Sequence, residues 1–253
     1  MKKALIIARL TFIETMRRQV ELITFFLAIG IMVLPSAANA FGLGASERVV
    51  KDIALTLTGY YGLLLSVFFG SVAIPGEIER KLIYPVITRP MPRRAYLWGK
   101  WLGLMGFVAF SQAVLGLTLV GSLYVVMNHL DLELWKPVVG YLLEDAVLLA
   151  VCLCFSTFSS PPLAAVLGLF VYLFGGLPQA FLDFFLRNSS LQTGIANTLK
   201  TVTPHFEYFH VKNAVVHHDA VPATYLVALA GYALVWVVFA QLMAESWFER
   251  KNL

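Results

Sequence analysis

Residues 54–100 read ALTLTGYYGLLLSVFFGSVAIPGEIERKLIYPVITRPMPRRAYLWGK, an apolar run followed by a basic segment that prolines interrupt. The apolar part, Ala54–Ile74, is long enough to cross about 30 Å of hydrocarbon as a helix. The basic part, Glu77–Lys100, has a net charge of +4, which equals that of the whole chain. Basic loops beside membrane-spanning helices stay in the cytoplasm. We therefore expect a membrane protein with a cytoplasmic segment at 77–100.

The composition of the whole chain favours the same class. Of its 253 residues, 59% are hydrophobic and only 13% are charged, whereas a soluble domain carries about 25% charged residues. The positive charge is confined to segments that flank apolar runs, which is typical of topology signals and not of a nucleic-acid-binding face. We expect membrane lipids as partners and no nucleic acid.

Six apolar runs are long enough to span a bilayer. Lipid offers the backbone no hydrogen-bond partners, so each run must satisfy its own peptide groups as a helix. We expect an all-α integral membrane protein in which residues 1–253 form a single transmembrane domain. Its six spans are predicted at roughly Leu22–Ala40, Ala54–Ile74, Trp101–Met127, Val138–Phe158, Leu163–Leu186 and Thr224–Met243.

The distribution of Lys and Arg predicts that both termini are cytoplasmic. The predicted inner segments hold 13 of these residues and the outer segments hold six, and positive charge favours the inner side. An alternative is that the first run is a cleaved secretory signal ending at Ala38-Asn39-Ala40. We favour a span, because Arg9, Arg17 and Arg18 precede the uninterrupted apolar run and cleavage would leave five spans.

Two segments outside the spans are predicted to be helical at the membrane surface. Residues 1–20 are amphipathic, with Leu5, Phe12, Ile13 and Met16 on one side, which favours an interfacial helix over a frayed basic tail. Residues 187–221 are too polar to span and too long for a turn. Short helices that dip into the outer leaflet are expected there, at Leu191–Val202 and Phe206–Val216.

Three prolines shape the basic segment. Pro85, Pro90 and Pro92 disfavour α conformation in the residues that precede them. Span two is therefore predicted to continue to about Tyr84, and a new helix to begin near Pro92, where proline suits a first turn. The result is a compact cytoplasmic knob whose guanidinium groups suit carboxylates or lipid phosphates. A plain loop that only sets topology is the alternative.

The order of motifs in this region has a counterpart in a known family. Glu77-Ile78-Glu79-Arg80-Lys81-Leu82, Pro85-Val86-Ile87-Thr88-Arg89-Pro90, then Gly99-Lys100-Trp101-Leu102-Gly103, together with the basic ending Phe248–Leu253, resemble type-2 ABC transporter permeases. Within that family, the nitrous-oxide-reductase maturation permeases are the most similar subgroup. The chain departs from the family pattern at Arg80-Lys81, where Gly-Thr is common, and at Asn252, where Asp is usual.

The resemblance implies an ABC exporter permease in a bacterial cytoplasmic (inner) membrane. It implies a homodimer that binds two copies of a separate ATP-binding cassette subunit, with ATP and Mg on that subunit and no cofactor on this chain. Nucleotide-driven closure of the ATPase would reorient the two six-helix bundles through a coupling helix between spans two and three. The residues predicted to bind the ATPase are Glu77, Glu79, Arg80, Lys81, Arg89, Arg93, Arg94 and Lys100.

Motifs of common enzymes are missing from the sequence. It has no G-x-x-x-x-G-K-[ST], no G-x-S-x-G and no H-E-x-x-H. We therefore expect no ATPase or other enzyme activity in this chain. A membrane-embedded enzyme and a scaffold subunit of a membrane complex are the alternatives.

A few polar residues inside the apolar runs are candidates for a cavity or translocation path: Gln112, Glu144, Asp145 and Asp183. Acids in hydrocarbon are costly and usually face a cavity or partner, although interfacial acids in contact with water are an alternative. Gln112 suits a hydrogen bond between helices.

Histidines and cysteines offer weaker candidates. His205, His210, His217 and His218 could bind copper or zinc, but their spacing matches no closed site, so we assign no metal. Cys152 and Cys154 are expected to be packing residues.

Overall fold

The structure, a computed structural model, contains helices and connecting turns and no strand in the ranges that it describes. These are residues 2–17, 20–40, 47–79, 92–127, 132–176, 203–216 and 221–250.

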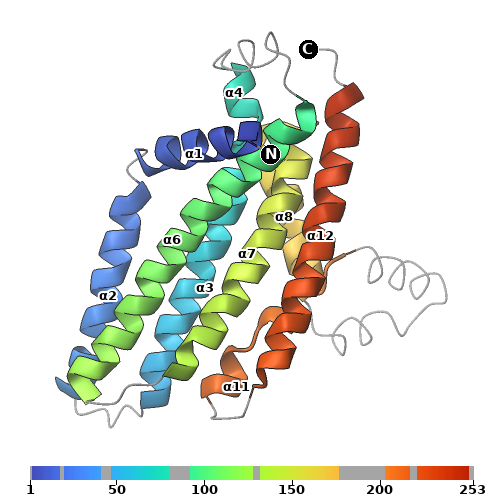
Figure 1. The fold of residues 1–253 in the computed structure, drawn as a ribbon. Helices are drawn as coiled ribbons and strands as arrows, with labels where there is room; N and C mark the ends of the chain where they lie inside the picture. Colours follow the sequence, from blue (N-terminus) through green and yellow to red (C-terminus); the bar gives the residue numbers. More distant parts are fainter. Residues whose placement is uncertain are drawn as a thin grey trace.

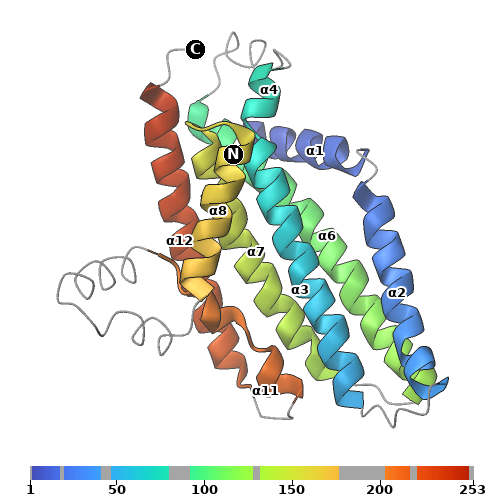
Figure 2. The same ribbon diagram turned by 180° about the vertical axis from the view of Figure 1, so that it is seen from behind.

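Most of the helices run along one shared axis and form a bundle (Figures 1 and 2). Helix α1 lies crosswise at one end of this bundle, the end that also holds α4 and the last turns of α12. The helices are α1 (Lys2–Met16), α2 (Val20–Ala40), α3 (Glu47–Val72), α4 (Pro75–Glu79), α6 (Arg93–Met127), α7 (Trp135–Ser156), α8 (Pro161–Gly176), α11 (Lys212–Val216) and α12 (Ala223–Arg250), with short 3-10 turns η1 (Leu132–Leu134) and η2 (Phe206–Phe209).

Helix α7 is the centre of the bundle. Every residue from Glu144 to Cys154 is buried, whereas the surrounding helices expose large apolar side chains such as Leu64, Leu117 and Val227. A bundle with an apolar exterior matches a hydrocarbon solvent, and it would be poorly soluble in water. The predicted all-α membrane class agrees with this arrangement.

Four of the described helices are long and apolar enough to cross a bilayer: Val49–Val72, Arg94–Val125, Trp135–Ser156 and Ala223–Phe248. They correspond to predicted spans two, three, four and six. The apolar stretches Val20–Val33 and Pro161–Gly176 are shorter; the 16 residues of α8 reach only about 24 Å at 1.5 Å per residue. The remaining two spans stay predictions.

Before the basic segment, the end of the second span differs from the sequence prediction. Helix α3 ends at Val72, and a separate helix, α4, begins at Pro75, so the expected continuation to Tyr84 was wrong. Proline lacks an N–H and clashes with the preceding turn, and Pro75-Gly76 was a visible signal for this break. The predicted element at Val86–Arg89 lies outside the described residues.

On the other side, the predicted start of the next helix is confirmed. Helix α6 begins at Arg93, directly after Pro92, and the Ala95 N–H donates to the Pro92 carbonyl at 2.9 Å.

Helix α1 packs against α6 through two glycines. A Cβ on Gly99 would lie 2.8 Å from the Ala4 carbonyl oxygen, and one on Gly103 would lie 2.5 Å from that of Ala8, so the two backbones touch. The packed face of α1 includes Ile7 and Thr11. Its exposed face is apolar but differs from the predicted one, because Leu5 and Ile13 lie there with Ile6 and Leu10 whereas Phe12 and Met16 contact the core.

The segment 203–216 folds inward onto the bundle. It forms η2 and α11, which lie within the predicted range Phe206–Val216; their place in the outer leaflet stays a prediction. Phe206 and Phe209 are fully buried, and a Cβ on Gly140 of α7 would lie 2.7 Å from the Phe209 carbonyl oxygen. The segment thus lies directly on α7 and is a wall of the bundle. Leu191–Val202 is outside the described residues.

Candidate functional site

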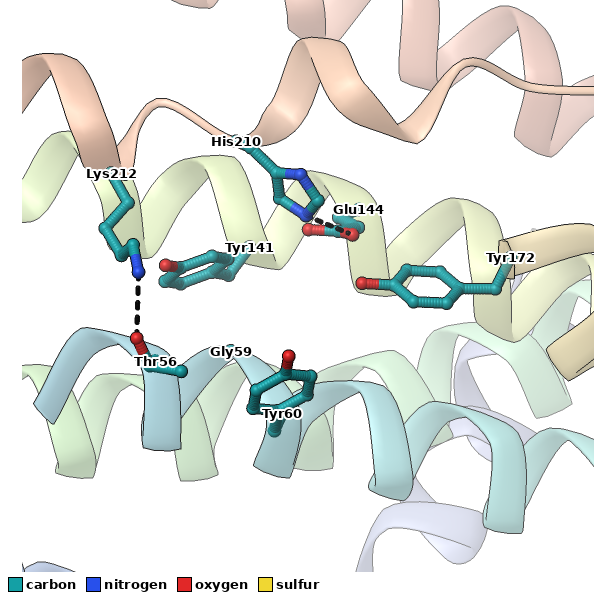
Figure 3. A pocket seen from close by; sticks show the side chains of 8 residues that line it. All are labelled: Thr56, Gly59, Tyr60, Tyr141, Glu144, Tyr172, His210 and Lys212. Carbon is teal, nitrogen blue, oxygen red and sulfur yellow. Dashed lines mark hydrogen bonds and ion pairs between the residues drawn. The ribbon is translucent and has the colours of Figure 1, made fainter. Parts of the chain in front are cut away.

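A cavity of about 240 Å³ lies between α3, α7, α8 and the segment 203–216. It sits in the half of the bundle away from α1 (Figures 1 and 3). We call it the tyrosine cavity. Its lining residues are Thr56, Gly59 and Tyr60 of α3, Tyr141 and Glu144 of α7, Tyr172 of α8, and His210 and Lys212.

Helical spacing places the lining residues of each helix on one face. Tyr141 and Glu144 are three apart on α7, as are Thr56 and Gly59 on α3, and residues three or four apart share a helix face. The two helices approach closely at Gly59, because a Cβ there would lie 3.0 Å from the Tyr141 ring.

Two charged contacts fasten the segment 203–216 across the cavity. His210 Nε2 lies 3.2 Å from Glu144 Oε1. Lys212 Nζ lies 2.9 Å from Asp52 Oδ1 and donates to Thr56 Oγ1 at 2.8 Å. The segment is therefore tied to α7 by one contact and to α3 by the other.

The contact between His210 and Glu144 is expected to make this attachment depend on pH. The polar contact with Glu144 raises the pKa of His210 above 6.5, and burial opposes the shift. A raised folded-state pKa gives stability that is fully present below about 6.5 and is lost as the pH rises through the raised value. After correction for intrinsic rates, we expect amide hydrogen exchange in residues 206–216 to accelerate as the pH passes through that window.

The variant His210→Gln provides the control, because glutamine does not titrate. Its corrected exchange rates should not change with pH. Equal pH dependence in the variant and the wild type would contradict the assignment to His210.

Asp145, next to Glu144, points away from this cavity into the packed core. Gln112 Nε2 donates to Asp145 Oδ2 at 2.9 Å and to the Thr58 carbonyl at 3.3 Å. Gln112 and Asp145 are 1% and 2% exposed, so this contact joins α3, α6 and α7 in the interior. The predicted hydrogen bond of Gln112 between helices is confirmed, and Asp145 lies in the packed interior, whereas Glu144 lines the cavity.

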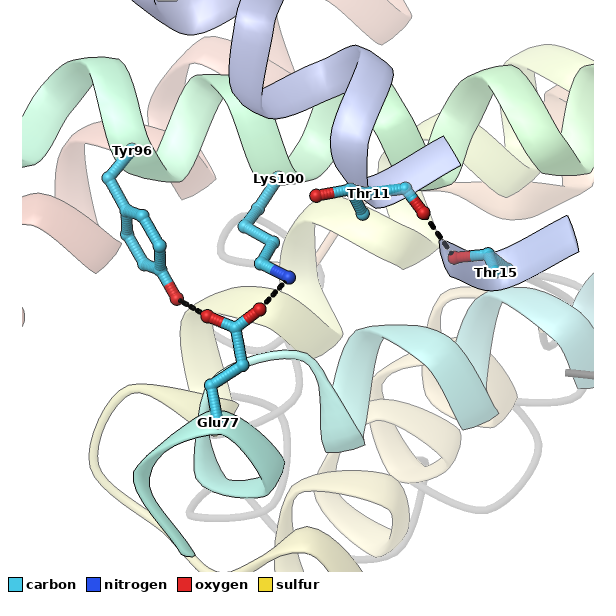
Figure 4. Close-up of polar contacts among 5 residues, drawn as sticks. All are labelled: Thr11, Thr15, Glu77, Tyr96 and Lys100. Carbon is cyan, nitrogen blue, oxygen red and sulfur yellow. Dashed lines mark hydrogen bonds and ion pairs between the residues drawn. The ribbon is translucent and has the colours of Figure 1, made fainter. Parts of the chain in front are cut away.

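A second polar cluster lies at the other end of the bundle, beside α1 (Figure 4). The carboxylate of Glu77 on α4 accepts a hydrogen bond from the Tyr96 hydroxyl and pairs with Lys100, both on α6. The side chains of Lys100 and Glu77 are 8% and 15% exposed. Two further links join this end of α6 to its neighbours, Arg94 with Glu245 of α12 and Tyr96 stacked on Phe248.

Nearly the whole chain also matches a known family of proteins. Residues 5–253 match the family model described as ABC-2 family transporter protein. The chain belongs to this family. It is therefore a multi-pass membrane permease subunit of an ABC transporter, the transport subunit and not the ATPase, and the family implies an ATP-binding cassette partner. No curated protein matches the chain.

The residues predicted to bind the ATPase lie in different surroundings. Glu77 and Lys100 face each other inside the bundle, and Arg94 is largely exposed while it pairs with Glu245. Glu79 and Arg93 lie at the end of α4 and the start of α6. Arg80, Lys81 and Arg89 lie outside the described residues.

The predicted cavity and metal residues are dispersed. Glu144 lines the tyrosine cavity, Gln112 and Asp145 lie in the core, and Asp183 is outside the described residues, as are His217 and His218. The His205 ring stacks on Tyr208 at 5.5 Å, away from His210. The described part of the chain contains no group of three or more potential metal-ligating side chains. Cys152 and Cys154 are buried and free, as expected of packing residues.

Several residues of the tyrosine cavity were not found from the sequence. These are Thr56, Gly59, Tyr60, Tyr141, Tyr172 and Lys212. The spacings Tyr141-x-x-Glu144 and Thr56-x-x-Gly59-Tyr60 were a usable signal, because each sets polar groups on one face of an apolar helix. Nothing in the sequence indicated that these two faces meet.

Proposed function

We propose that the permease is an exporter subunit that works as a homodimer, with two copies of a separate ATPase bound at the segment 77–100. In this proposal residues 1–253 form one permease domain in a bacterial inner membrane, with both termini cytoplasmic. The excess of Lys and Arg in the inner segments supports that orientation. The likeness of the motifs in 77–100 to the nitrous-oxide-reductase maturation permeases supports that subgroup.

The observation that carries the proposal is the contact of Glu77 on α4 with Lys100 and Tyr96 on α6, which we call the joint between these helices. The segment 77–100 begins in α4 and ends in α6, and Glu77 of α4 is bonded to Lys100 and Tyr96 of α6. A force on the segment therefore acts on both helices together. A rigid element with buried polar contacts transmits displacement between sites better than a flexible loop does.

Three contacts would carry such a displacement further into the bundle. The glycine contacts of α6 with α1 would move the crosswise helix. The pair Arg94–Glu245 and the stacked rings of Tyr96 and Phe248 would move α12. Because α6 and α12 both border α7, a shift at one end of the bundle would change the packing around the tyrosine cavity.

This arrangement divides the predicted docking residues between two roles. Glu77 and Lys100 are proposed as an internal joint, because each is mostly buried and bonded to the other. Contact with the ATPase is proposed for Glu79, Arg80, Lys81, Arg89 and Arg93, with Arg94 at its edge. Guanidinium groups suit carboxylates of a protein partner because they donate two parallel hydrogen bonds.

Charge reversal at Arg93 tests the docking proposal. We expect Arg93→Glu to reduce the ATPase activity of the reconstituted complex at least tenfold, because a like charge would oppose partner carboxylates. Binding of the ATPase subunit should weaken in parallel, and membrane insertion should be unchanged. The measurement is ATP hydrolysis by the complex in proteoliposomes, together with co-purification.

Lys251→Glu is the matched control for that experiment. It makes the same charge change on the same predicted side of the membrane, outside 77–100. We expect it to leave hydrolysis near the wild-type rate. Full activity of Arg93→Glu, or equal losses in both variants, would refute docking at this segment.

A further inference from the structure

The tyrosine cavity combines aromatic rings with one buried carboxylate. Tyr60, Tyr141 and Tyr172 come from three different helices and line the same cavity as Glu144 (Figure 3). Aromatic faces attract cations through the ring quadrupole, and cages of aromatic rings recognise quaternary ammonium groups. A carboxylate within the cage would supply the matching negative charge.

Glu144 is a buried acid whose polar partners also line the cavity. Its side chain is only 7% exposed, and Oε1 lies 3.2 Å from His210 Nε2. The Tyr172 hydroxyl is a further hydrogen-bond partner of this carboxylate. A buried carboxylate is stable only with a compensating partner, so a cation that enters the cavity can compete with His210 for Glu144.

The other cation of the cavity is already engaged. Lys212 pairs with Asp52 and donates to Thr56, so its charge is balanced on the α3 side. His210 is half exposed, with 42% of its side chain open, and it belongs to the segment 203–216 rather than to the membrane helices. It is therefore the group that can most easily leave Glu144.

We propose that the tyrosine cavity binds a small organic cation, a quaternary or protonated amine, whose ammonium group replaces the His210 imidazole beside Glu144. The cavity of about 240 Å³ is smaller than the roughly 300–1,000 Å³ of pockets for drug-sized ligands, which suits a small amine. Binding of this ligand does not depend on the proposed function above. Its role as transported cargo does, because that role requires the permease to be an exporter.

Competition with His210 makes the binding depend on pH. The charged groups that face His210 are Glu144, Glu207 and Lys212, and the tyrosines of α3, α7 and α8 complete its surroundings. A protonated imidazole holds Glu144, and a neutral one releases it. Each pH unit below the pKa of His210 should therefore weaken cation binding by up to about tenfold, and above that pKa the affinity should level off.

Calorimetry on the purified chain tests the proposal. The probes are phenyltrimethylammonium and benzenesulfonate, which share a ring and differ in charge, and a maltoside detergent avoids the amine headgroups of lipids. We expect the ammonium probe to bind, more tightly at pH 8.5 than at pH 5.5, and the sulfonate not to bind. Absence of ammonium binding, or sulfonate binding of equal strength, would overturn the proposal.

Three variants locate the binding. At pH 8.5, where competition by His210 is weakest, Glu144→Gln should weaken the ammonium probe at least tenfold. At the same pH, Glu207→Gln, which removes a carboxylate outside the cavity lining, should bind like the wild type. His210→Gln should bind at both pH values with little difference between them, which also shows that the cavity is intact. Unchanged affinity in Glu144→Gln, or unchanged pH dependence in His210→Gln, would contradict the assignment.

The calorimetry needs no ATPase, so its result is independent of the docking test. Loss of ATPase binding in Arg93→Glu with no ammonium binding would overturn the cation inference alone. Ammonium binding with full activity of Arg93→Glu would overturn the docking proposal alone.

Discussion

Gly62→Ala should destabilise the bundle more than an alanine at the other helical glycines considered below. A Cβ at this position of α3 would lie 2.0 Å from Gln112 Nε2 and 2.1 Å from Asp145 Oδ2. Both side chains are almost fully buried, so they cannot swing into open space. They would have to give up the 2.9 Å hydrogen bond between them.

Two costs are combined in this variant. Overpacking a core costs about 1–3 kcal/mol, and a buried polar group that loses its hydrogen bond costs about 1–3 kcal/mol more. We expect a lower free energy of unfolding and a clearly lower melting temperature in detergent. Thermal unfolding followed by size-exclusion chromatography measures the change.

Gly231→Ala and Gly30→Ala are matched controls, since a Cβ at either site meets nothing within 4 Å. Both should be neutral or slightly stabilising, because alanine is the better helix former. Equal melting temperatures for Gly62→Ala and Gly231→Ala would show that the core contact between Gln112 and Asp145 is not packed as described.

Lys100→Met should impair both stability and coupling. It leaves the Glu77 carboxylate, only 15% exposed, without its cation. Removal of one partner from a buried ion pair costs about 3–5 kcal/mol, and partial exposure places the expected loss at about 3 kcal/mol or below. Because α4 and α6 lose a joint, we expect ATP hydrolysis by the complex to fall at least tenfold while the ATPase subunit still co-purifies.

Exchange of the two charges distinguishes loss of the Glu77–Lys100 pair from a non-specific disruption of the fold. The double variant Glu77→Lys, Lys100→Glu restores a pair of opposite charges, so it should recover part of the stability and hydrolysis that each single variant loses. Lys100→Arg keeps the charge and should be milder than Lys100→Met. Full ATP hydrolysis in Lys100→Met would show that the pair does not couple the helices. So would a loss of stability and hydrolysis in the double variant that equals the sum of the losses in Glu77→Lys and Lys100→Glu alone.

Helix ends could be predicted from the sequence more readily than the contacts between helices on which these two predictions depend. Pro92 marked the start of α6, because the effect of a proline depends only on nearby residues. Pro75 could have marked the end of α3 in the same way. By contrast, the partner of Gly62 lies on two other helices, and no spacing in the chain indicates which helix faces which.

The candidate site shows the same division. Glu144 was found as an acid in an apolar run, because its desolvation is a local property of the sequence. The tyrosines were not found, because a tyrosine in such a run is ordinary until its neighbours are known. Lys212 and Thr56, which are 156 positions apart, meet only because the segment 203–216 folds back onto α3 and α7.

Hydrophobic runs, charge counts and prolines act locally, so they were enough to predict the membrane environment, the helical class, the expected side of 77–100 and the family motif. The packing of the helices was needed to show that Glu77 faces Lys100, that Asp145 and Glu144 point into different surroundings, and that three tyrosines and one carboxylate line the same cavity. Adjacent residues on a helix differ by about 100° in direction, so the packing of the neighbouring helices gives each its own environment.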